Sequence, residues 1–201
     1  MPSTLRRTHW LRRPATVVLL LSCAAAAASM HAETVVFDPA RTTVDFTLGD
    51  VLHTVHGTFR LKSGVIHFDP GTGKASGSVV VDATSGDSGS RARDGRMHKN
   101  ILESGSYPEI VFTPDSVNGK ISSEGTAQAQ VHGVFRIHGV DHEMTLPFQV
   151  QTEGGQVTAA TRFSVPYVEW GLKNPSTFLL KVSEMVDIGI RAVGRLSEER
   201  P

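Results

Sequence analysis

The chain has 201 residues, with 20 Lys and Arg against 20 Asp and Glu, and 39% of its residues are hydrophobic. This composition excludes a disordered or fibrous chain and favours one globular domain. Cys23 is the only cysteine, so a disulfide framework and a cysteine-rich zinc site are both excluded.

The first 32 residues have the pattern of a secretory signal. Four arginines precede the apolar run 15–28, and the small residue Ala32 follows it. A run of this length is shorter than the ~20 residues that a helix needs to cross a bilayer. We therefore predict a cleaved signal peptide (1–32), no transmembrane segment, and a mature domain (33–201) that is periplasmic or secreted. Acylation of Cys23 is a weaker alternative for the same segment.

The charge of the mature chain differs from that of the whole. The leader contains four arginines and no acidic residue, which leaves 16 of the 20 basic side chains against all 20 acidic ones, a net charge of −4. A mildly acidic domain without a basic run argues against nucleic acid or an anionic membrane surface as the main partner.

From residue 33 onward, hydrophobic and polar residues alternate, which is the period of a half-buried β-strand. The clearest case is 54–61, where Val55, Phe59 and Leu61 share one face. The same alternation predicts further strands at 42–48, 64–69, 74–82, 109–117, 120–138, 142–153, 156–165 and 183–196.

Turn residues separate these strands. The pairs at 118–119 and 154–155 predict two-residue turns, because their glycines tolerate positive φ, and the stretch 70–73 predicts a longer turn. Successive strands are therefore expected to be antiparallel neighbours.

Two segments depart from the strand pattern. The segment 91–102 is predicted as a helix, with Ser90 as its N-cap and with Met97 and Ile101 four residues apart on one face. The segment 166–180 is predicted as a long loop between the last two strands.

Eight to ten antiparallel strands must close into a barrel or split into a sandwich, because an open sheet of that width would expose its edges. Long strands that contain glycines bend easily, which favours the barrel. We therefore predict an all-β fold, an extended antiparallel β-barrel of about eight strands with one short helix. Small inward residues, such as Gly57 and Ala129, would either leave an apolar cavity or only fit the taper of a packed barrel.

One strand pattern is repeated. The stretch 55–61 recurs 76 residues later as 131–137, with six of seven positions identical or conservatively matched. Each copy carries an inward Gly-x-Phe. The repeat suggests two related halves of one sheet system, although chance similarity between alternating strands would give the same pattern.

Three groups of segments in the mature chain resemble the YceI-like family of exported lipid-binding proteins. They are 37–46 with 53–59; Arg93-Asp94 and Met97-His98 with 104–112; and 131–133 with 137–140 and 186–190. The resemblance implies a lipocalin-like barrel that holds a long apolar molecule, such as a polyisoprenoid, an isoprenoid quinone or a fatty-acid derivative, for transport, storage or sequestration. It implies neither catalysis nor a cofactor, and it favours a cavity over a packed interior.

The resemblance leaves some properties open. Arg91, Arg93 and Arg96 make the predicted helix more basic than expected, and we expect them to influence which headgroup is held. A homodimer is one candidate oligomeric state, but the alternation of residues along the strands does not show whether the protein is a monomer or a dimer.

The candidate lining of the ligand site consists of apolar residues on strands and in the two covering segments, and each of them would equally suit an ordinary core. The strand candidates are Val44, Phe46, Val55, Phe59, Val81, Phe112, Phe135, Phe148, Phe163 and Ile188, and the lid candidates are Met97, Ile101, Trp170 and Phe178. Burial of each ligand methylene would contribute about 0.8 kcal/mol, so a long tail can be held by burial alone.

A catalytic serine is disfavoured. The stretch Gly86-Asp87-Ser88-Gly89 matches the nucleophile segment of chymotrypsin-like proteases. In those proteases a histidine and an acid precede the serine on a complete barrel, and too few residues precede Ser88 here. A polar loop before the helix is the preferred interpretation.

Two alternatives to lipid binding remain. His132 and His138 share a strand face by parity, so a metal site across strands is conceivable, although no metal-binding motif supports it. A non-enzymatic structural or interaction module would use the loops 83–108 and 166–180, and a fully packed interior would favour it.

Overall fold

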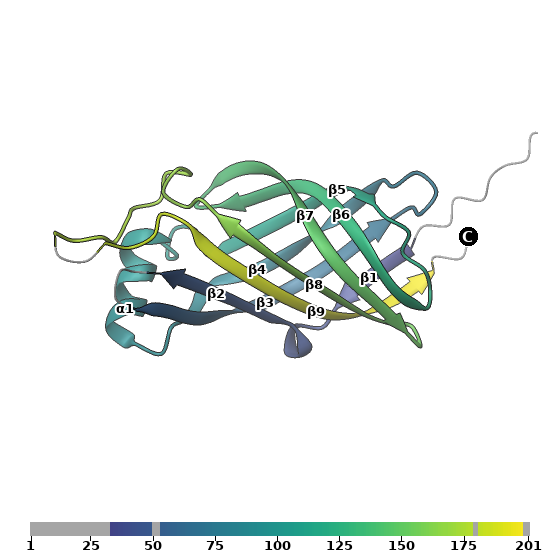
Figure 1. The fold of residues 1–201 in the computed structure, drawn as a ribbon, viewed down its shortest axis with the longest axis horizontal. Coiled ribbons are helices and arrows are strands. Elements are labelled where there is room, and N and C mark those ends of the chain that lie inside the picture. The colour runs from purple at the N-terminus through teal and green to yellow at the C-terminus, as the bar shows by residue number, and fades with distance from the viewer. Residues whose placement is uncertain (1–32, 50–52, 179–180, 199–201) are drawn as a thin grey trace, which may run out of the picture.

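The computed structural model describes residues 33–49, 53–178 and 181–198, which form one elongated barrel (Figure 1). The predicted signal peptide and Cys23 lie outside these residues. Within the described part, no helix has the length and apolarity that a membrane crossing requires.

Strands account for most of the described residues. In chain order the elements are β1 (Glu33–Phe37), the 3-10 turn η1 (Pro39–Arg41), β2 (Thr43–Gly49), β3 (Thr54–Phe68), β4 (Ala75–Asp87), α1 (Arg91–Arg96), the π-helical turn η2 (Met97–Ile101), β5 (Glu109–Asn118), β6 (Gly125–Ile137), β7 (Val140–Glu153), β8 (Gln156–Val165) and β9 (Val186–Glu198).

The sheet closes on itself. Strands β1 and β2 both pair with β3 on one side and with β9 on the other, so they occupy one position of the barrel, with η1 between them. Neighbouring strands are antiparallel, and the pairing of β3 with β4 completes the ring. The predicted all-β barrel of eight strands with one short helix is confirmed.

Several predicted boundaries are wrong. The stretches 54–61 and 64–69 form the single strand β3, whose register with β4 shifts between Leu61 and Ser63. Strand β1 was not predicted. Strand β6 begins at Gly125, so 119–124 is a longer connection and not a two-residue turn. The turn at 154–155 is confirmed, since both glycines have positive φ.

The helix is predicted at the right place but with a different form. It starts at Arg91 and continues after Arg96 as a π-helical turn. Ser90 occupies the N-cap position, but its side chain makes no capping hydrogen bond. Instead, the Asp94 carboxylate accepts hydrogen bonds from the backbone N–H and the hydroxyl of Ser88, which ties the helix back to the loop after β4.

The two repeated glycines allow close packing and do not open space. A Cβ at Gly57 would lie 2.3 Å from the Phe46 ring, and one at Gly133 would lie 2.3 Å from the Thr113 carbonyl oxygen. Each inward Gly-x-Phe therefore lets a neighbouring group approach the strand.

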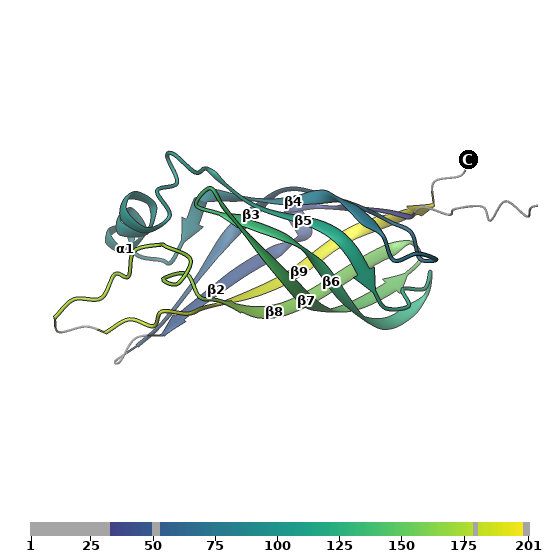
Figure 2. The same cartoon turned by 90° about the horizontal axis from the view of Figure 1, so that it is seen from above.

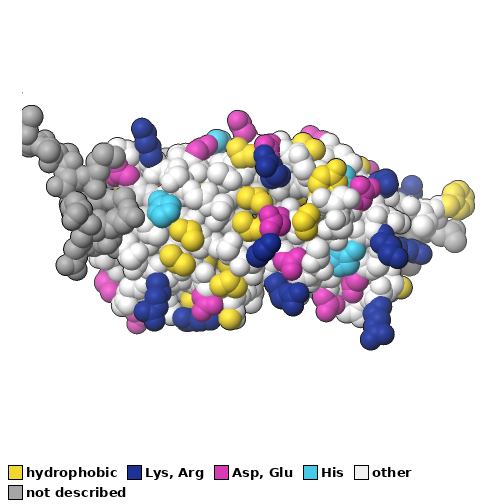
Figure 3. All heavy atoms as spheres, turned by 180° about the vertical axis from the view of Figure 1, so that it is seen from behind, with side chains coloured by type: hydrophobic (Ala, Val, Ile, Leu, Met, Phe, Trp, Pro, Cys, Tyr) yellow, Lys and Arg dark blue, Asp and Glu magenta, His cyan; other side chains and the backbone are white. Residues whose placement is uncertain are grey.

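Among the described residues, the buried polar side chains are hydroxyls, and no charged residue is buried. On the back face, basic and acidic side chains are interspersed and hydrophobic ones form small separate patches (Figure 3). Seen from above, α1 lies at one end of the barrel, and the segment after β8 extends beyond the same end (Figure 2). We call this the mouth end and the opposite one the far end.

Candidate functional site

A first apolar cavity lies in the mouth half of the barrel. This mouth cavity has a volume of about 140 Å³. Inward-facing residues of three strands, Val44, Val165 and Ile188, form part of its wall, and Ile101 and Leu172 cover it. The covering residues come from η2 and from the segment 166–178, so segments outside the sheet close this end.

A second apolar cavity lies in the far half. This far cavity has a volume of about 110 Å³, and its lining includes Phe68, Val117, Val150, Val157 and Ala192. These five side chains are all buried. Strand residues therefore supply most of this cavity's wall.

Three side chains line both cavities: Phe135, Phe163 and Ile190. The rings of Phe135 and Phe163 meet edge to face, with 6.2 Å between their centroids. The two cavities are therefore halves of one lumen, which this partition divides.

The size of the two halves sets a condition on any ligand. Each is similar in size to an apolar cavity of ~150 Å³ that binds one benzene ring. Ligand pockets usually measure ~300–1,000 Å³. A long chain therefore fits only if the aromatic partition moves aside and joins the halves.

Most predicted lining residues face this lumen. The mouth cavity is lined by the candidates Val44, Phe46, Phe59, Val81, Met97, Ile101, Phe135, Phe163 and Ile188. The far cavity is lined by the candidates Phe112, Phe135, Phe148 and Phe163. Their contact with a ligand stays a prediction.

Three candidates do not line either cavity. Val55 is half-buried on β3. Trp170 stacks on His142 with 3.9 Å between the ring centroids, and it lies 5.8 Å from Phe135. The predicted lid position of Phe178 is wrong, because its side chain is 98% exposed. A loop has no strand parity, so nothing in the local sequence indicated which way Phe178 points.

Several residues that line the cavities were not predicted. The alternation of residues could have predicted Leu48, Ile190 and Ala192 as lining residues, because they occupy inward positions on β2 and β9. No comparable signal existed for Tyr167 and Leu172, because the segment that carries them has no period.

Hydrogen bonds hold the helical cover in place. The two ring nitrogens of His98 lie 2.9 Å from the Gly86 carbonyl oxygen and 3.0 Å from the Ser104 hydroxyl. Ser88 is engaged by Asp94 and by the Arg93 guanidinium, not by a histidine. The contacts of Ser88 agree with a polar connection before the helix, but the predicted loop begins too early, because β4 continues to Asp87.

Glu103 connects three parts of the mouth end. Its carboxylate lies 3.4 Å from the Lys173 ammonium and 3.3 Å from His138 Nε2. The nearby Lys173 ammonium, followed by the His138 ring, lowers the pKa of Glu103 below its usual value. The contacts join the turn after η2, the segment 166–178 and the β6–β7 hairpin.

Tyr167 anchors the segment after β8. Its side chain is 5% exposed, and its hydroxyl donates a hydrogen bond of 2.7 Å to the Ser183 carbonyl oxygen. Burial, with a smaller contribution from the charge of Glu184, raises the pKa of Tyr167 to about 12. The neutral phenol is thus part of the closed cover.

The histidines expected to share a strand face do not do so. The strand ends at Ile137, and His138 has a φ of 53° in the hairpin that follows. His132 instead contacts the Asp115 carboxylate. Among the described residues, no three His, Cys, Asp or Glu side chains are grouped so that they could hold a metal ion.

Comparison with known families and structures gives consistent results. A family model described as YceI-like domain matches residues 36–193. No curated protein sequence matches the chain.

Three solved structures share the fold. BcnA of Burkholderia cenocepacia is 18% identical with a TM-score of 0.64, and the match covers 78% of this chain and 98% of BcnA. A polyisoprenoid binding domain from Saccharophagus degradans, implicated in plant cell wall breakdown, is 15% identical with a TM-score of 0.61 and coverages of 81% and 98%. A YceI protein of Campylobacter jejuni is 18% identical with a TM-score of 0.55 and coverages of 75% and 88%.

Proposed function

The chain belongs to the family of YceI-like domains, and from this premise we propose that it is an exported binding protein that holds a long apolar chain in its lumen. The ligand class is a polyisoprenoid, an isoprenoid quinone or a fatty-acid derivative. The protein carries, stores or sequesters this molecule and does not transform it. The structural neighbour described as a polyisoprenoid binding domain supports the prenyl class.

The observation that carries the proposal is the apolar lumen itself. Both cavities are lined by aliphatic and aromatic side chains, and the one phenol among them, Tyr167, is bonded to Ser183. A wall of this kind offers no partner to a buried polar group, which would be costly to bury there. It therefore suits a hydrocarbon tail.

Binding is driven by removal of the tail from water. Each buried methylene contributes about 0.8 kcal/mol, and part of this energy is used to displace Phe135 and Phe163. The displacement makes a long chain a better ligand than a short one, because only a long chain gains contacts in both halves.

Export rests on the leader sequence. The pattern of residues 1–32 supports a cleaved signal peptide and a periplasmic or secreted mature protein. N-terminal sequencing of the protein recovered from the periplasm and medium should give a first residue near Glu33. Recovery of the intact leader from the cytoplasm would contradict export.

A homodimer stays a prediction that sedimentation would test.

The test of the ligand is organic extraction of the protein purified from its own cells, followed by mass spectrometry. We expect a long prenyl or acyl compound in near-stoichiometric amount. Absence of any such lipid, together with no uptake of geranylgeraniol or hexadecanol in vitro, would contradict the proposal.

A matched pair of variants supplies the control. Ala159 faces the far cavity, whereas its neighbour Thr158 alternates to the other face of β8. Ala159→Phe should fill the far half and remove the extracted lipid, at a cost of about 1–3 kcal/mol in unfolding free energy from overpacking. Thr158→Phe adds the same ring outside and should retain the lipid.

A further inference from the structure

The hydrogen-bonded ladder between β7 and β8 ends halfway along the strands. Its paired positions run from Glu153 with Gln156 to Gln149 with Ala160. The same register would next bring Phe148 opposite Thr161 and then Pro147 opposite Arg162, but neither pair forms, although β7 continues to pair with β6 and β8 with β9. The two ribbons diverge in this stretch (Figure 1). We call the unpaired stretch the seam.

The sequence accounts for the end of the ladder. Proline has no backbone N–H to donate, so within a sheet it suits a position whose N–H side is unpaired. Pro147 lies two residues from Gln149, the last position of β7 that pairs with β8. A second interruption lies between β4 and β5, but there the Lys74–Ser116 bridge and a hydrogen bond from the Val117 N–H to the Gly73 carbonyl oxygen rejoin the strands.

A groove of about 640 Å³ lies along the seam on the outside of the barrel. Its floor includes Ala129, Phe148 and Ile190, and these three side chains also line the far cavity. Groove and lumen are therefore separated by only one layer of side chains. Around the rest of the barrel, apart from the interruption between β4 and β5, paired strands form the wall.

The layer of side chains between groove and lumen contains a buried hydroxyl, that of Thr161. Thr161 is 6% exposed and lines the groove, and its Oγ1 has no hydrogen-bond partner. A buried hydroxyl without a partner destabilises a protein, so its presence calls for an explanation. A polar atom of a ligand that crosses the seam would satisfy it.

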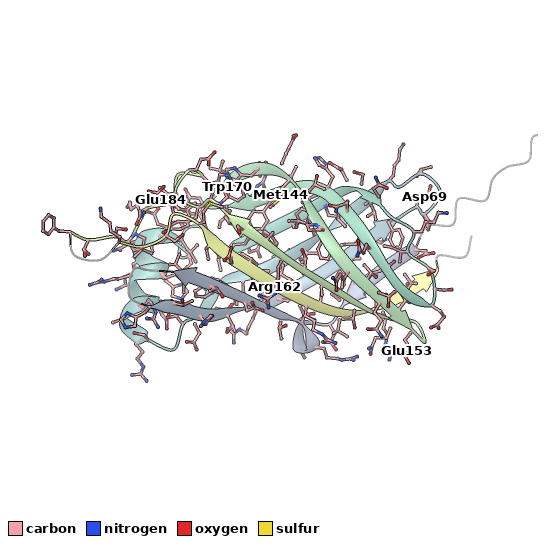
Figure 4. The ribbon with its side chains drawn as sticks, in the orientation of Figure 1. Asp69, Met144, Glu153, Arg162, Trp170 and Glu184 are labelled. Carbon is pink, nitrogen blue, oxygen red and sulfur yellow. The ribbon has the colours of Figure 1, made fainter. Side chains whose placement is uncertain are left out.

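The outer wall of the groove is polar and carries two cations. Arg162 and Arg191 are exposed on β8 and β9, and neither has an ion pair or a hydrogen bond within the described part of the chain. Figure 4 shows Arg162 on the outer surface of the barrel. Asp45 is the acidic residue of the groove, and Asp187 joins Arg162 in the adjoining hollow.

Three amides complete this wall, those of Gln128, Gln130 and Gln149. Two guanidinium groups and three amides against one carboxylate favour a small anionic group, such as a phosphate or a carboxylate, over a cation.

We propose that the seam between β7 and β8 is a side passage, with the headgroup of an anionic amphiphile in the groove on Arg162 and Arg191 while its tail passes Thr161 into the lumen. The inference rests on the proposed function, because it assumes that the lumen holds the tail. It places the headgroup on the side of the barrel and not at the mouth.

The test uses the full chain and two probe pairs with matched tails: geranylgeranyl phosphate with geranylgeraniol, and palmitate with hexadecanol. The variant Arg162→Gln/Arg191→Gln should lower the affinity for geranylgeranyl phosphate about a hundredfold, about tenfold for each charged contact. Its affinity for geranylgeraniol should stay unchanged. If only the affinity for geranylgeranyl phosphate falls, the groove binds a phosphate headgroup. If the affinity for palmitate falls equally, the groove also binds carboxylates.

Two further variants locate the effect. Arg195→Gln is the matched control, since Arg195 is exposed on β9 but does not line the groove. Arg91→Gln/Arg96→Gln removes two exposed cations of α1 at the mouth end. If the α1 double variant lowers the affinity for geranylgeranyl phosphate and the Arg162→Gln/Arg191→Gln variant does not, the headgroup lies at the mouth and the proposal is wrong.

The remaining outcomes separate this inference from the proposed function. If every variant binds the phosphate as the unmodified protein does, the groove is not the headgroup site, while lumen binding stands. If the unmodified protein binds none of the four probes, the proposed function itself fails.

Thr161→Val tests the passage separately. The change removes the hydroxyl and keeps the shape, so the empty protein should gain thermal stability. Affinity for geranylgeranyl phosphate should fall several-fold. A lower Tm with unchanged affinity would show that the hydroxyl serves the empty protein and would overturn its assignment to the passage.

Discussion

The two ends of the barrel use similar side chains in different settings. At the far end, residues such as Phe37, Phe68 and Val157 are buried between paired strands. At the mouth end, Val165 is equally buried and Phe59 is half-buried, but the cover is made of η2 and the segment 166–178, which lie outside the sheet. The comparison indicates that the mouth end, whose cover is not part of the hydrogen-bonded sheet, can open at lower cost than the far end.

The largest expected effect is on the stability of the far end. Phe68→Ala should lower the free energy of unfolding by about 3–5 kcal/mol, because a cavity remains in well-packed surroundings. Phe59→Ala, in the mouth half, should cost only about 1–2 kcal/mol, since part of that ring is not buried in the folded protein. Urea unfolding of both variants measures the difference, and equal losses would contradict the comparison.

The next largest effect is expected on ligand affinity, when the aromatic partition between the two halves of the lumen is removed. Phe163→Ala removes the ring that meets Phe135, so a long chain no longer has to break an aromatic contact worth ~0.5–1.5 kcal/mol. Affinity for geranylgeraniol should rise by up to about tenfold. Phe59→Ala enlarges the mouth cavity without touching the partition and serves as the control. A similar gain in both variants would show that the partition does not limit binding.

The buried phenol of Tyr167 predicts that the stability of the folded protein depends on pH in the alkaline range. Because the pKa of Tyr167 is raised to about 12 in the folded protein and is ~10 in an unfolded chain, the unfolded state loses its proton first. The stability linked to this group is complete below pH 10 and is lost between pH 10 and 12. Thermal unfolding should show this loss, and Tyr167→Phe should remove it at a cost of about 1 kcal/mol at neutral pH. An identical pH profile in the variant would contradict the assignment.

The smallest effect is expected at the exposed carboxylate that joins the cover. Since the pKa of Glu103 is lowered in the folded protein, its contribution is present above its usual value of 4.5 and is lost as the pH falls through the lowered one. Glu103→Gln should raise the rate of proteolysis in the segment 166–178 by a few-fold at most, because exposed ion pairs are weak. The matched control is Asp115→Asn, which breaks an exposed contact with His132 between β5 and β6, away from the cover. Equal cleavage in both variants would show that Glu103 does not hold the cover.

Alternation of residues was enough to predict most of the fold. It placed β2 and β4 to β9, with errors of up to five residues at the end of β4 and the start of β6, because each strand has one face toward the lumen and one toward water. It missed β1, which has five residues and two adjacent valines and pairs only with the distant ends of β3 and β9. Short strands of this kind are defined by their partners and not by their own sequence.

The candidate site was predictable only in part. Strand parity indicated Phe46, Phe135 and Phe163 as inward residues, but the contact between Phe135 and Phe163 joins positions 28 residues apart, which no local pattern shows. The orientation of Phe178 could not be predicted for lack of periodicity. Pro147 was a readable sign of an interrupted ladder, because proline within a strand restricts its pairing.

The central claim, that the lumen holds a hydrocarbon tail, is tested most directly by fluorescence quenching. Once the predicted leader 1–32 is removed, Trp170 is the only tryptophan left, and its ring centroid lies 5.8 Å from that of Phe135. Titration with a stearic acid that carries a nitroxide quencher on its chain should give saturable quenching that geranylgeraniol reverses by competition. Quenching that rises linearly with the probe, as for collisions in solution, and that geranylgeraniol leaves unchanged would contradict the account.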